Sequence, residues 1–252
     1  MRLRLITLDR RAAPRRFALG PALPESVALT VGAGGMAALV VSENDPHVLL
    51  GPRDRRLPGI ERGIAWLRSQ ELPVLERIGG GSAVLLDEGC VSFAVAVPCS
   101  DLTRARENFA ELTGGVLRAL GELGIAARVG ATAGAFCDGP YDVKVGGRKL
   151  VGVAQAIRRG FALVSGMVLV SQDPWTSTGI VQGFYERAGS LERLRPEAVT
   201  SVARELGRPV TAAEVAQALV RGYGETAQLV ASSPDPAEWD EAERILARRR
   251  VG

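Results

Sequence analysis

Lysine is almost absent from this chain. Of its 252 residues, 29 are arginine and only two, Lys144 and Lys149, are lysine. Because arginine supplies the positive charge everywhere else, a retained lysine indicates a place that needs a compact ammonium group instead of a planar guanidinium. Both lysines follow Cys137 within twelve residues, in the segment YDVKVGGRKLVG (141–152). Two lysines left by chance on an exposed hairpin would give the same pattern, so this signal needs support from other residues.

Cysteine and histidine are scarce as well. The three cysteines, Cys90, Cys99 and Cys137, are an odd number and show no CxxC spacing. This pattern predicts neither a zinc site nor a disulfide framework, and we expect no metal. Reduced thiols in the cytoplasm are the simplest interpretation.

Long apolar runs are missing. None approaches the roughly 18–20 residues that a membrane span needs. The basic segment 1–17 also lacks an apolar stretch followed by a small-residue cleavage site. We therefore predict a cytoplasmic protein with no signal peptide and no membrane partner.

Aromatic residues make up 5% of the chain and do not alternate with basic residues. The net charge is +3 and the sequence pI is about 9.0, with basic residues concentrated in 2–16 and 248–250. Such a charge permits either nucleic acid or an acidic protein as a partner. Because the interleaved basic and aromatic residues of single-strand binders are missing, we predict no nucleic-acid partner.

The hydrophobic pattern predicts an α+β fold, with a mixed, largely antiparallel sheet, flanking helices and a helical C-terminal part. The apolar content of 46% and charged content of 23% fit a globular enzyme with one large domain, or one domain and a small appendage. Strands give way to helices after Pro174. We therefore predict a catalytic core of residues 1–185 and a helical extension, 186–252, packed on it.

Periodicity and turn residues locate the individual elements. In the first half we predict strands at 36–42 and 47–51, a helix at 60–70, an antiparallel hairpin around the turn Asp87-Glu88-Gly89, and a helix at 100–124. In the second half we predict a hairpin at 141–151 that turns at Gly146-Gly147, a strand at 161–170, a helix from Pro196 to Gly207, a helix opened by a Thr211–Glu214 capping box, and a helix from Asp235-Pro236 to Arg250.

Three consecutive glycines, Gly79, Gly80 and Gly81, stand between an extended segment and a strand. Glycines here let the backbone approach a ligand closely and turn its N–H groups toward it. A tight bend at a sheet corner is the alternative. The loop is not a Walker loop, because no Gly-Lys-Ser/Thr follows, and it is not a dinucleotide fingerprint.

Cys137 lies in a glycine-flanked loop, AFCDGP, and this position makes a reactive thiol as plausible as the inert, buried thiol that is usual for cysteine. The single histidine, His47, opens an apolar strand, and we interpret it as structural and not as the base of a Cys–His pair. A nearby positive charge such as Lys149 is the better support for a thiolate. Arg77 is a candidate substrate clamp, although a solvated arginine explains it equally well. Asp87 is a candidate orienting group, although a plain turn aspartate is the better explanation.

Two segments together resemble the lipoate–protein ligase and octanoyltransferase superfamily: RIGGGSAVLLDEG (77–89) and YDVKVGGRKLVGVAQ (141–155). The resemblance covers roughly residues 46–185. It implies the fold shared with class II synthetases and biotin ligases, and it implies that Lys149 contacts the acyl carbonyl. The substrate-binding residues that it implies are Arg77, Gly79, Gly80, Gly81, Ser82, Ala83, Asp87 and Gly152.

Within this superfamily, Cys137 matches the loop nucleophile of cysteine-dependent octanoyltransferases, where ligases usually have Arg-Asn-Asp. The stretches LGPRDRRLPGI (50–60) and AVLLDEG (83–89) are similar to the LipL-type amidotransferase branch. That branch moves octanoyl from the glycine-cleavage H protein to lipoyl domains of 2-oxoacid dehydrogenases. Ile78, where serine or threonine is usual, and the third glycine, Gly81, depart from the pattern and put the donor in doubt.

The resemblance implies two-step acyl transfer through a thioester on Cys137, with Lys149 stabilising the developing oxyanion. The donor is the H protein or acyl carrier protein, the acyl group octanoyl or lipoyl, and no cofactor is needed. We expect a monomer. Two alternatives stay open: an ATP-dependent lipoate–protein ligase, and a catalytically silent subunit that binds lipoyl domains.

Overall fold

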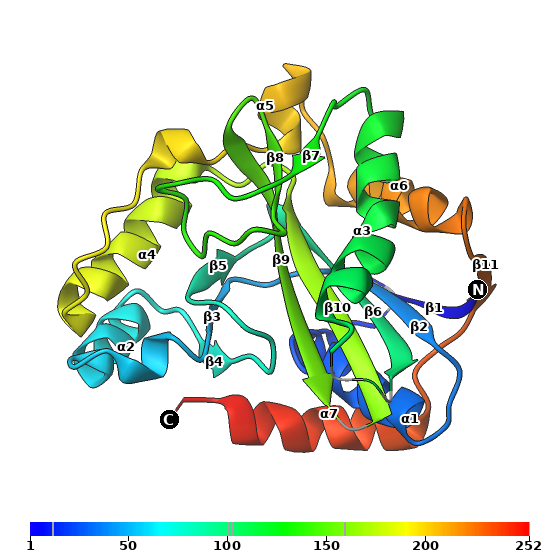
Figure 1. Ribbon diagram of the computed structural model, residues 1–252. Helices are drawn as coiled ribbons and strands as arrows, with labels where there is room; N and C mark the ends of the chain where they lie inside the picture. The colour runs from blue at the N-terminus through cyan, green and yellow to red at the C-terminus, as the bar shows by residue number, and fades with distance from the viewer. Residues whose placement is uncertain (12, 100, 102, 159, 252) are drawn as a thin grey trace.

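The computed structural model describes residues 1–251 except 12, 100, 102 and 159. Its centre is an eight-stranded sheet with strand order β11-β1-β2-β6-β10-β9-β8-β7 (Figure 1). In chain order, its strands are β1 (Arg2–Leu8), β2 (Ala38–Glu43), β6 (Cys90–Cys99), β7 (Arg128–Val129), β8 (Val143–Val145), β9 (Arg148–Arg158), β10 (Gly160–Leu169) and β11 (Gln228–Ala231). Strands β11, β1 and β2 are parallel to one another, and every pairing from β2 to β7 is antiparallel.

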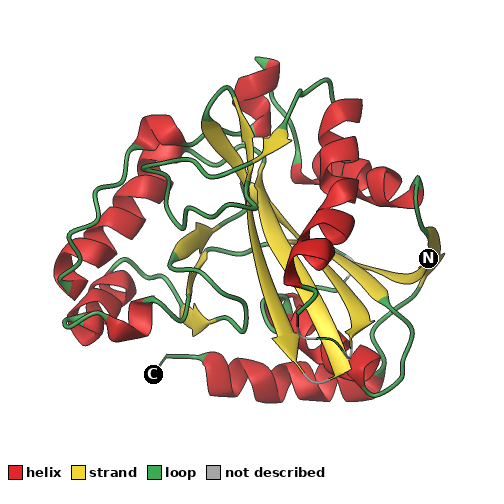
Figure 2. Cartoon of the chain, in the orientation of Figure 1, coloured by secondary structure: helices red, strands yellow, loops and turns green. Residues whose placement is uncertain are grey.

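A second sheet of three short strands lies beside the large one (Figure 2). Its strands are β3 (His47–Leu50), β4 (Val74–Glu76) and β5 (Val84–Leu86). Strand β3 is central, parallel to β4 and antiparallel to β5.

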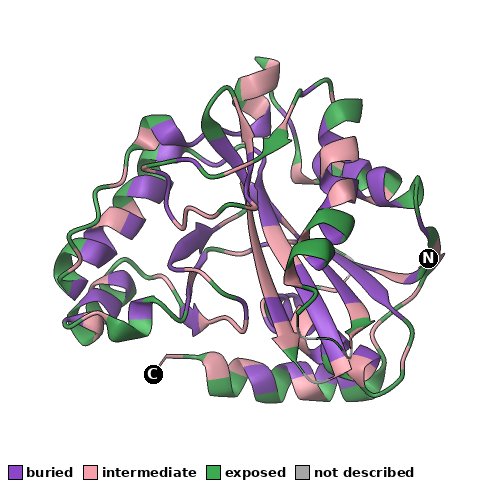
Figure 3. Cartoon of the chain, viewed as in Figure 1, coloured by how far each residue is buried: buried purple, intermediate pink, exposed green. Residues whose placement is uncertain are grey.

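Helices cover both sheets. Their bounds are α1 (Leu23–Gly32), α2 (Ile60–Ser69), α3 (Ala105–Glu122), α4 (Pro174–Ala188), α5 (Val202–Leu206), α6 (Ala212–Gly224) and α7 (Pro236–Arg249), with 3₁₀ turns η1 (Phe17–Leu19), η2 (Asp54–Arg56) and η3 (Pro196–Ala198). Helices α3 and α6 pack on one face of the large sheet, and α1 and α7 on the other. Helices α2 and α4 pack on the small sheet. Figure 3 shows the buried residues along the strands and on the helix sides that face them.

The predicted α+β class is confirmed, and so are several of its elements. The Gly146-Gly147 turn joins β8 to β9, and the two glycines have φ of 53° and 83°, as a two-residue hairpin turn requires. The capping box that opens α7 is complete, with Asp235 and Glu238 as its partners. At α6, the Thr211 hydroxyl accepts from the Glu214 N–H, but the Glu214 carboxylate binds Arg208 instead of completing the box.

The predicted hairpin around Asp87-Glu88-Gly89 is wrong. Strand β5 pairs with β3 of the small sheet, whereas β6 pairs with β2 on one side and β10 on the other. Because both edges of β6 are occupied, β5 has no edge to join. The turn carries the chain from one sheet to the other, and the Gly89 carbonyl anchors it by accepting from the Val170 N–H (2.8 Å).

Two predicted helices differ from the structure. The predicted helix at 196–207 is instead η3, an extended segment and then α5, because the Thr200 N–H donates to the Lys149 carbonyl (2.9 Å) of β9. Helix α3 begins at Ala105, later than predicted, and Asp101 before it accepts from the Thr103 N–H and hydroxyl in a local turn. Residues 100 and 102 of that predicted helix lie outside the described residues.

Elements at both ends of the chain were not predicted, namely β1, α1 and β11. Strand β11 pairs with β1, so residues near the two ends of the chain share the edge of the large sheet. The division into residues 1–185 and 186–252 stays a prediction. Among the described residues, no helix is long and apolar enough to cross a bilayer.

An ion pair joins these two ends of the chain. Arg4 of β1 donates two hydrogen bonds to Glu238 of α7 (2.8 and 2.9 Å), and the Glu238 side chain has no exposed surface. We expect Glu238→Ala to lower the free energy of unfolding by about 2–3 kcal/mol, below the usual cost of breaking a buried pair because Arg4 keeps some contact with solvent.

Urea denaturation would measure this loss. The matched control is Glu241→Ala on the same helix, whose partners Arg244 and Arg248 are solvent-exposed, and which should cost less than about 1 kcal/mol. Equal costs for the two variants would contradict the structural role given to Glu238.

Candidate functional site

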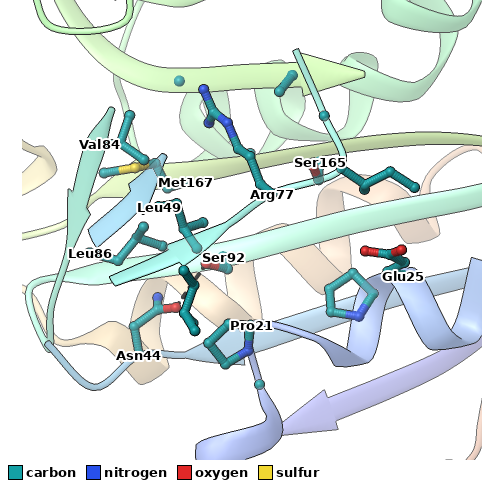
Figure 4. Close-up of a pocket in the computed structure, with 18 of the residues that line it drawn as sticks. Pro21, Glu25, Asn44, Leu49, Arg77, Val84, Leu86, Ser92, Ser165 and Met167 are labelled. Atoms are coloured by element: carbon teal, nitrogen blue, oxygen red, sulfur yellow. Dashed lines mark hydrogen bonds between the residues drawn. The ribbon is translucent and has the colours of Figure 1, made fainter. Parts of the chain in front are cut away.

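A pocket lies between the two sheets, and its walls are mostly apolar. Figure 4 shows Leu49, Val84, Leu86 and Met167 gathered on one side of it. These residues come from β3, β5 and β10, so both sheets contribute to the wall. An apolar wall of this kind suits a hydrocarbon chain.

The pocket also has walls from both ends of the chain, which sequence reasoning missed. Pro21 and Glu25 contribute from the segment around α1, and Leu246 and Arg249 from α7. Arg249 donates to the Glu25 carboxylate (2.8 Å) and ties the two helices together at this wall. Only the three-dimensional pairing of the chain ends brings these residues to the pocket, so no local motif could have indicated them.

One end of the pocket is polar. Ser92 donates to Asn44 (3.0 Å), and Asn44 donates to the Cys90 carbonyl (3.1 Å), at the end away from Arg77 (Figure 4). His47 lines the same pocket, with Nδ1 2.7 Å from the Asp45 carbonyl. Burial lowers the pKa of His47 and favours the neutral ring. The partner of Nδ1 is a backbone carbonyl, and the structural role of His47 stays a prediction.

Cys137 lies on the loop between β7 and β8, and its backbone has φ of 47°. Left-handed backbone is uncommon for a residue other than glycine and persists where the surroundings impose it. The loop is held from within, because the Asp138 carboxylate accepts from the Thr132 N–H (2.5 Å) and the Asp142 carboxylate accepts from the Gly139 N–H (2.9 Å). The cysteine is therefore held in one conformation.

Two donors from the glycine loop point at the thiol. The Cys137 Sγ lies 3.0 Å from an Arg77 Nη2 and 3.2 Å from the Ser82 backbone N. The same Arg77 nitrogen donates to the Ser82 carbonyl (2.7 Å), which fixes the guanidinium beside the sulfur. A cation and an oriented N–H group are the surroundings that stabilise a thiolate.

The pKa of Cys137 is lowered, through opposing influences. Burial is the largest influence and acts to raise it, but the charges of Arg77 and Lys149 and the Ser82 N–H together outweigh burial. Cys90 shows the opposite case, since burial, reinforced by the Asp87 charge, raises the pKa of its thiol well above the ordinary value. The loop cysteine is thus the more acidic of these two thiols.

Lys149 is a buried ammonium, only 1% exposed, with three oxygen partners. Its Nζ lies 2.8 Å from Asp142 Oδ2, 3.0 Å from the Phe136 carbonyl and 2.7 Å from the Cys137 carbonyl. An ammonium has three N–H donors, so these partners use all of them. Direct contact with an acyl carbonyl, as the resemblance implies, therefore requires one of these three oxygens to give way.

Asp142 is a site residue to which sequence reasoning gave no role. It is buried beside Lys149, and its second oxygen, Oδ1, accepts from the Val153 N–H (2.9 Å). Asp142 opens the hairpin predicted at 141–151. The turn of that hairpin places residues 142 and 149 on its two paired arms. A buried lysine needs a counter-charge, and this requirement was the available signal.

The glycine loop is packed directly against the cysteine. Gly81 has φ of 102°, and a Cβ there would lie 2.7 Å from Cys137 Sγ and 2.5 Å from Arg77, so only glycine fits. Gly80 has open space around its Cα and donates to the Gln155 carbonyl (3.2 Å). Ser82 and Ala83 are buried directly after the glycines. Of this run, Gly79 lines the pocket itself.

The predicted site residues differ in whether they line the pocket. Cys137, Lys149, Arg77, Gly79 and Gly152 all line the pocket. At Gly152, a Cβ would lie 3.3 Å from the Lys149 Cε, so the missing side chain leaves room for the lysine. Asp87 lies at the crossing between sheets instead, where it accepts from the Gly89 N–H (2.9 Å). Over the part of the chain that is described, no cluster of His, Cys, Asp or Glu is placed to hold a metal ion.

Cys137, with its lowered pKa, lines an apolar pocket together with Arg77 and the buried Lys149, and this arrangement suits the binding of an acyl chain next to a nucleophile. The chain belongs to the lipoyl protein ligase A/B catalytic domain family, whose model matches residues 22–224. The superfamily resemblance of the two motifs is thereby confirmed.

Relatives with named activities resemble most of the chain. It is 30% identical over 241 residues to the octanoyl-[GcvH]:protein N-octanoyltransferase of Geobacillus kaustophilus, covering 90% of this chain and 84% of that protein. It is also 30% identical, over 243 residues with the same coverage, to the enzyme of that name from Anoxybacillus flavithermus. A crystal structure of lipoate-protein ligase A bound with ATP has the same fold, with a TM-score of 0.76 at 22% identity over 98% of this chain and 95% of that one.

We expect Cys137 to be alkylated by iodoacetamide with a pH midpoint below that of an ordinary thiol, about 8.5. Arg77→Ala should raise this midpoint, and each unit of increase should slow alkylation at neutral pH about tenfold because less thiolate is present. Peptide mapping by mass spectrometry would measure the rate at each cysteine. Buried Cys90 serves as the internal control and should stay unmodified; an ordinary midpoint at Cys137, unmoved by Arg77→Ala, would contradict the proposed role of the guanidinium.

Proposed function

We propose that this chain transfers an octanoyl group from the glycine-cleavage H protein to a lysine of a lipoyl domain. The named activities of the Geobacillus and Anoxybacillus relatives support the reaction and its donor. The observation that carries the proposal is the apolar pocket with Cys137 among its lining residues, its sulfur facing Arg77 and the Ser82 N–H. A pocket of this kind presents an acyl carbonyl to a nucleophile.

In the first step the Cys137 thiolate attacks the carbonyl carbon of the octanoyl amide on the donor lysine. The C–S bond forms, the amide C–N bond breaks, and the leaving amine takes up a proton from solvent. In the second step the neutral amine of the acceptor lysine attacks the thioester, loses a proton to solvent and releases the thiolate. Covalent catalysis divides one difficult exchange between amides into two easier reactions.

Arg77, Ser82 and Lys149 have distinct roles in these steps. Arg77 and the Ser82 N–H hold the thiolate at 3.0 and 3.2 Å before attack. Once the sulfur is bonded to carbon, the same two donors are free to bind the developing oxyanion, and one such donor is worth about 3–4 kcal/mol. Lys149 fixes the loop through the Phe136 and Cys137 carbonyls and adds its charge to the site.

The acyl chain lies along the wall formed by Leu49, Val84, Leu86 and Met167 in this proposal. Each buried methylene contributes about 0.8 kcal/mol, so an octanoyl chain has roughly 5 kcal/mol available for positioning its carbonyl. Neither a metal nor ATP takes part in this route. The chain acts as a monomer, and the acceptor is the lipoyl domain of a 2-oxoacid dehydrogenase.

An ATP-dependent ligase is the second candidate, because lipoate-protein ligase A, solved with ATP, shares this fold. In that reaction an acyl-adenylate replaces the thioester and Cys137 has no covalent role. Only the cysteine mechanism leaves the octanoyl group covalently bound to this protein, and mass spectrometry can detect that adduct.

We expect the purified protein to gain one octanoyl group when it is mixed with octanoylated H protein in the absence of ATP. Intact-mass spectrometry would measure the adduct, and parallel samples would contain octanoyl-acyl carrier protein, or free octanoate with ATP. The H-protein sample should give the adduct, because the relatives named above use that donor.

Cys137→Ser should remove the adduct and lower transfer to a lipoyl domain by at least a hundredfold, and Cys99→Ser is the matched control that should retain both. An adduct that forms only with octanoyl-acyl carrier protein would show that acyl carrier protein, and not the H protein, is the donor. Lipoyl-domain modification that needs ATP and persists in Cys137→Ser would make the protein a ligase, and no modification under any condition would favour the silent binding subunit.

A further inference from the structure

Asp54 is a buried carboxylate in the stretch 50–60, outside the two segments, 77–89 and 141–155, that carry the superfamily resemblance. It is 1% exposed and closes the tight turn of residues 51–54 from both sides. Its Oδ2 accepts from the Gly51 N–H (2.8 Å), and its own N–H donates to the Gly51 carbonyl (3.1 Å). A charge buried to this degree persists only where it is paired or hydrogen-bonded, so the turn depends on these contacts.

This turn presses against the backbone that binds the thiol. A Cβ on Gly51 would lie 2.1 Å from the Gly81 carbonyl oxygen and 2.7 Å from the Ser82 nitrogen, so the two backbones pack in direct contact. The Arg53 N–H also donates to the Gly81 carbonyl (3.4 Å). The Gly81–Ser82 peptide therefore cannot move toward the turn, and the N–H of that peptide is a donor to Cys137 Sγ.

The same turn holds Arg77. The Arg77 N–H donates to the carbonyl of Leu50, the residue directly before the turn (3.0 Å). The two donors to the sulfur are the Arg77 side chain and the Ser82 N–H, and the backbone that carries each of them contacts residues 50–54. Displacing the turn would move both donors together.

The carboxylate of Asp54 faces several groups of the site. Burial raises the pKa of Asp54 to about 6, against the Gly51 N–H, the Arg77 charge, the Ala83 N–H and the Tyr185 hydroxyl, which all favour the ionised form. Burial likewise raises the pKa of Tyr185, and the Asp54 charge adds to this effect. Arg77 thus lies in the electrostatic field of both Asp54 and Cys137.

We propose that Asp54 is a positioning residue for the Cys137 thiolate, which it serves by holding the 51–54 turn against the Gly81–Ser82 peptide and Arg77. This role depends on the proposed function in one respect, because it takes the Cys137 thiolate to be the nucleophile. Asp54 does not contact the substrate. It acts through the two donors that contact the sulfur.

Two substitutions separate this role from a role in stability alone. Asp54→Ala removes the acceptor for the Gly51 N–H and frees the turn. Asp54→Asn keeps an oxygen at the same place and should restore the geometry. The matched control is Asp173→Ala, which removes the carboxylate that accepts from the Thr176 N–H at the start of α4, away from the thiol.

The measurement is the pH profile of Cys137 alkylation for each variant, with transfer from octanoylated H protein recorded in parallel. We expect Asp54→Ala to raise the alkylation midpoint by about one unit, and hence to slow alkylation at neutral pH about tenfold. Asp54→Asn should return the rate to within about twofold of the unsubstituted protein. Asp173→Ala should leave the midpoint unchanged.

An unchanged midpoint in folded Asp54→Ala would overturn the proposal. If that variant does not fold, Gly51→Ala takes its place, because its Cβ pushes the Gly81 carbonyl while Asp54 stays intact; it should raise the midpoint likewise, and an unchanged midpoint overturns the proposal equally. Failure of the proposed function is recognised separately, as a lowered Cys137 midpoint in the unsubstituted protein without any acyl transfer.

Discussion

The buried ammonium of Lys149 is bound by three oxygen atoms that belong to the loop around Cys137. Its partners are the Asp142 carboxylate and the carbonyls of Phe136 and Cys137, all within 3.0 Å. A buried charge is costly unless it is paired, so the lysine forces these oxygens to converge on it. Cys137 takes up left-handed backbone as part of that arrangement. The conformation of Cys137 is therefore stabilised by the buried charge of Lys149 as well as by the hydrogen bonds of Asp138 and Asp142 within the loop.

The second constraint comes from the small sheet. Strands β4 and β5 flank the glycine loop, so the loop is fixed at both ends when it meets the cysteine. Gly81 permits contact that any Cβ would prevent, and Arg77 and the Ser82 N–H reach the sulfur across it. The apolar pocket is the space left between this sheet and the large one. The pocket and Cys137 thus lie side by side because two sheets that share no strand are packed together.

The sequence identified the family more completely than the strand pairing. The Gly146-Gly147 hairpin and helix α7 were predictable because short-range rules of turns and helix starts determine them, whereas the two motifs were identified by their resemblance to a known family. The pairing of β5 with β3 was not predictable, since it depends on which edges of β6 other strands already occupy. The pocket wall from α1 and α7 was missed for the same reason, because it exists only after distant segments have met. Asp142 lies in the same hairpin as Lys149 and was missed although the need of a buried lysine for a counter-charge indicated it.

The account stands on a thioester at Cys137 that forms and decays fast enough to lie on the reaction path. Rapid-quench mass spectrometry of a single turnover, with octanoylated H protein as donor and a lipoyl domain as acceptor, tests this directly. The account predicts that acyl-Cys137 forms before any acylated lipoyl domain and decays at the rate at which that product accumulates. Product that accumulates with no prior acyl-enzyme, or an acyl-enzyme that decays more slowly than product forms, would contradict it.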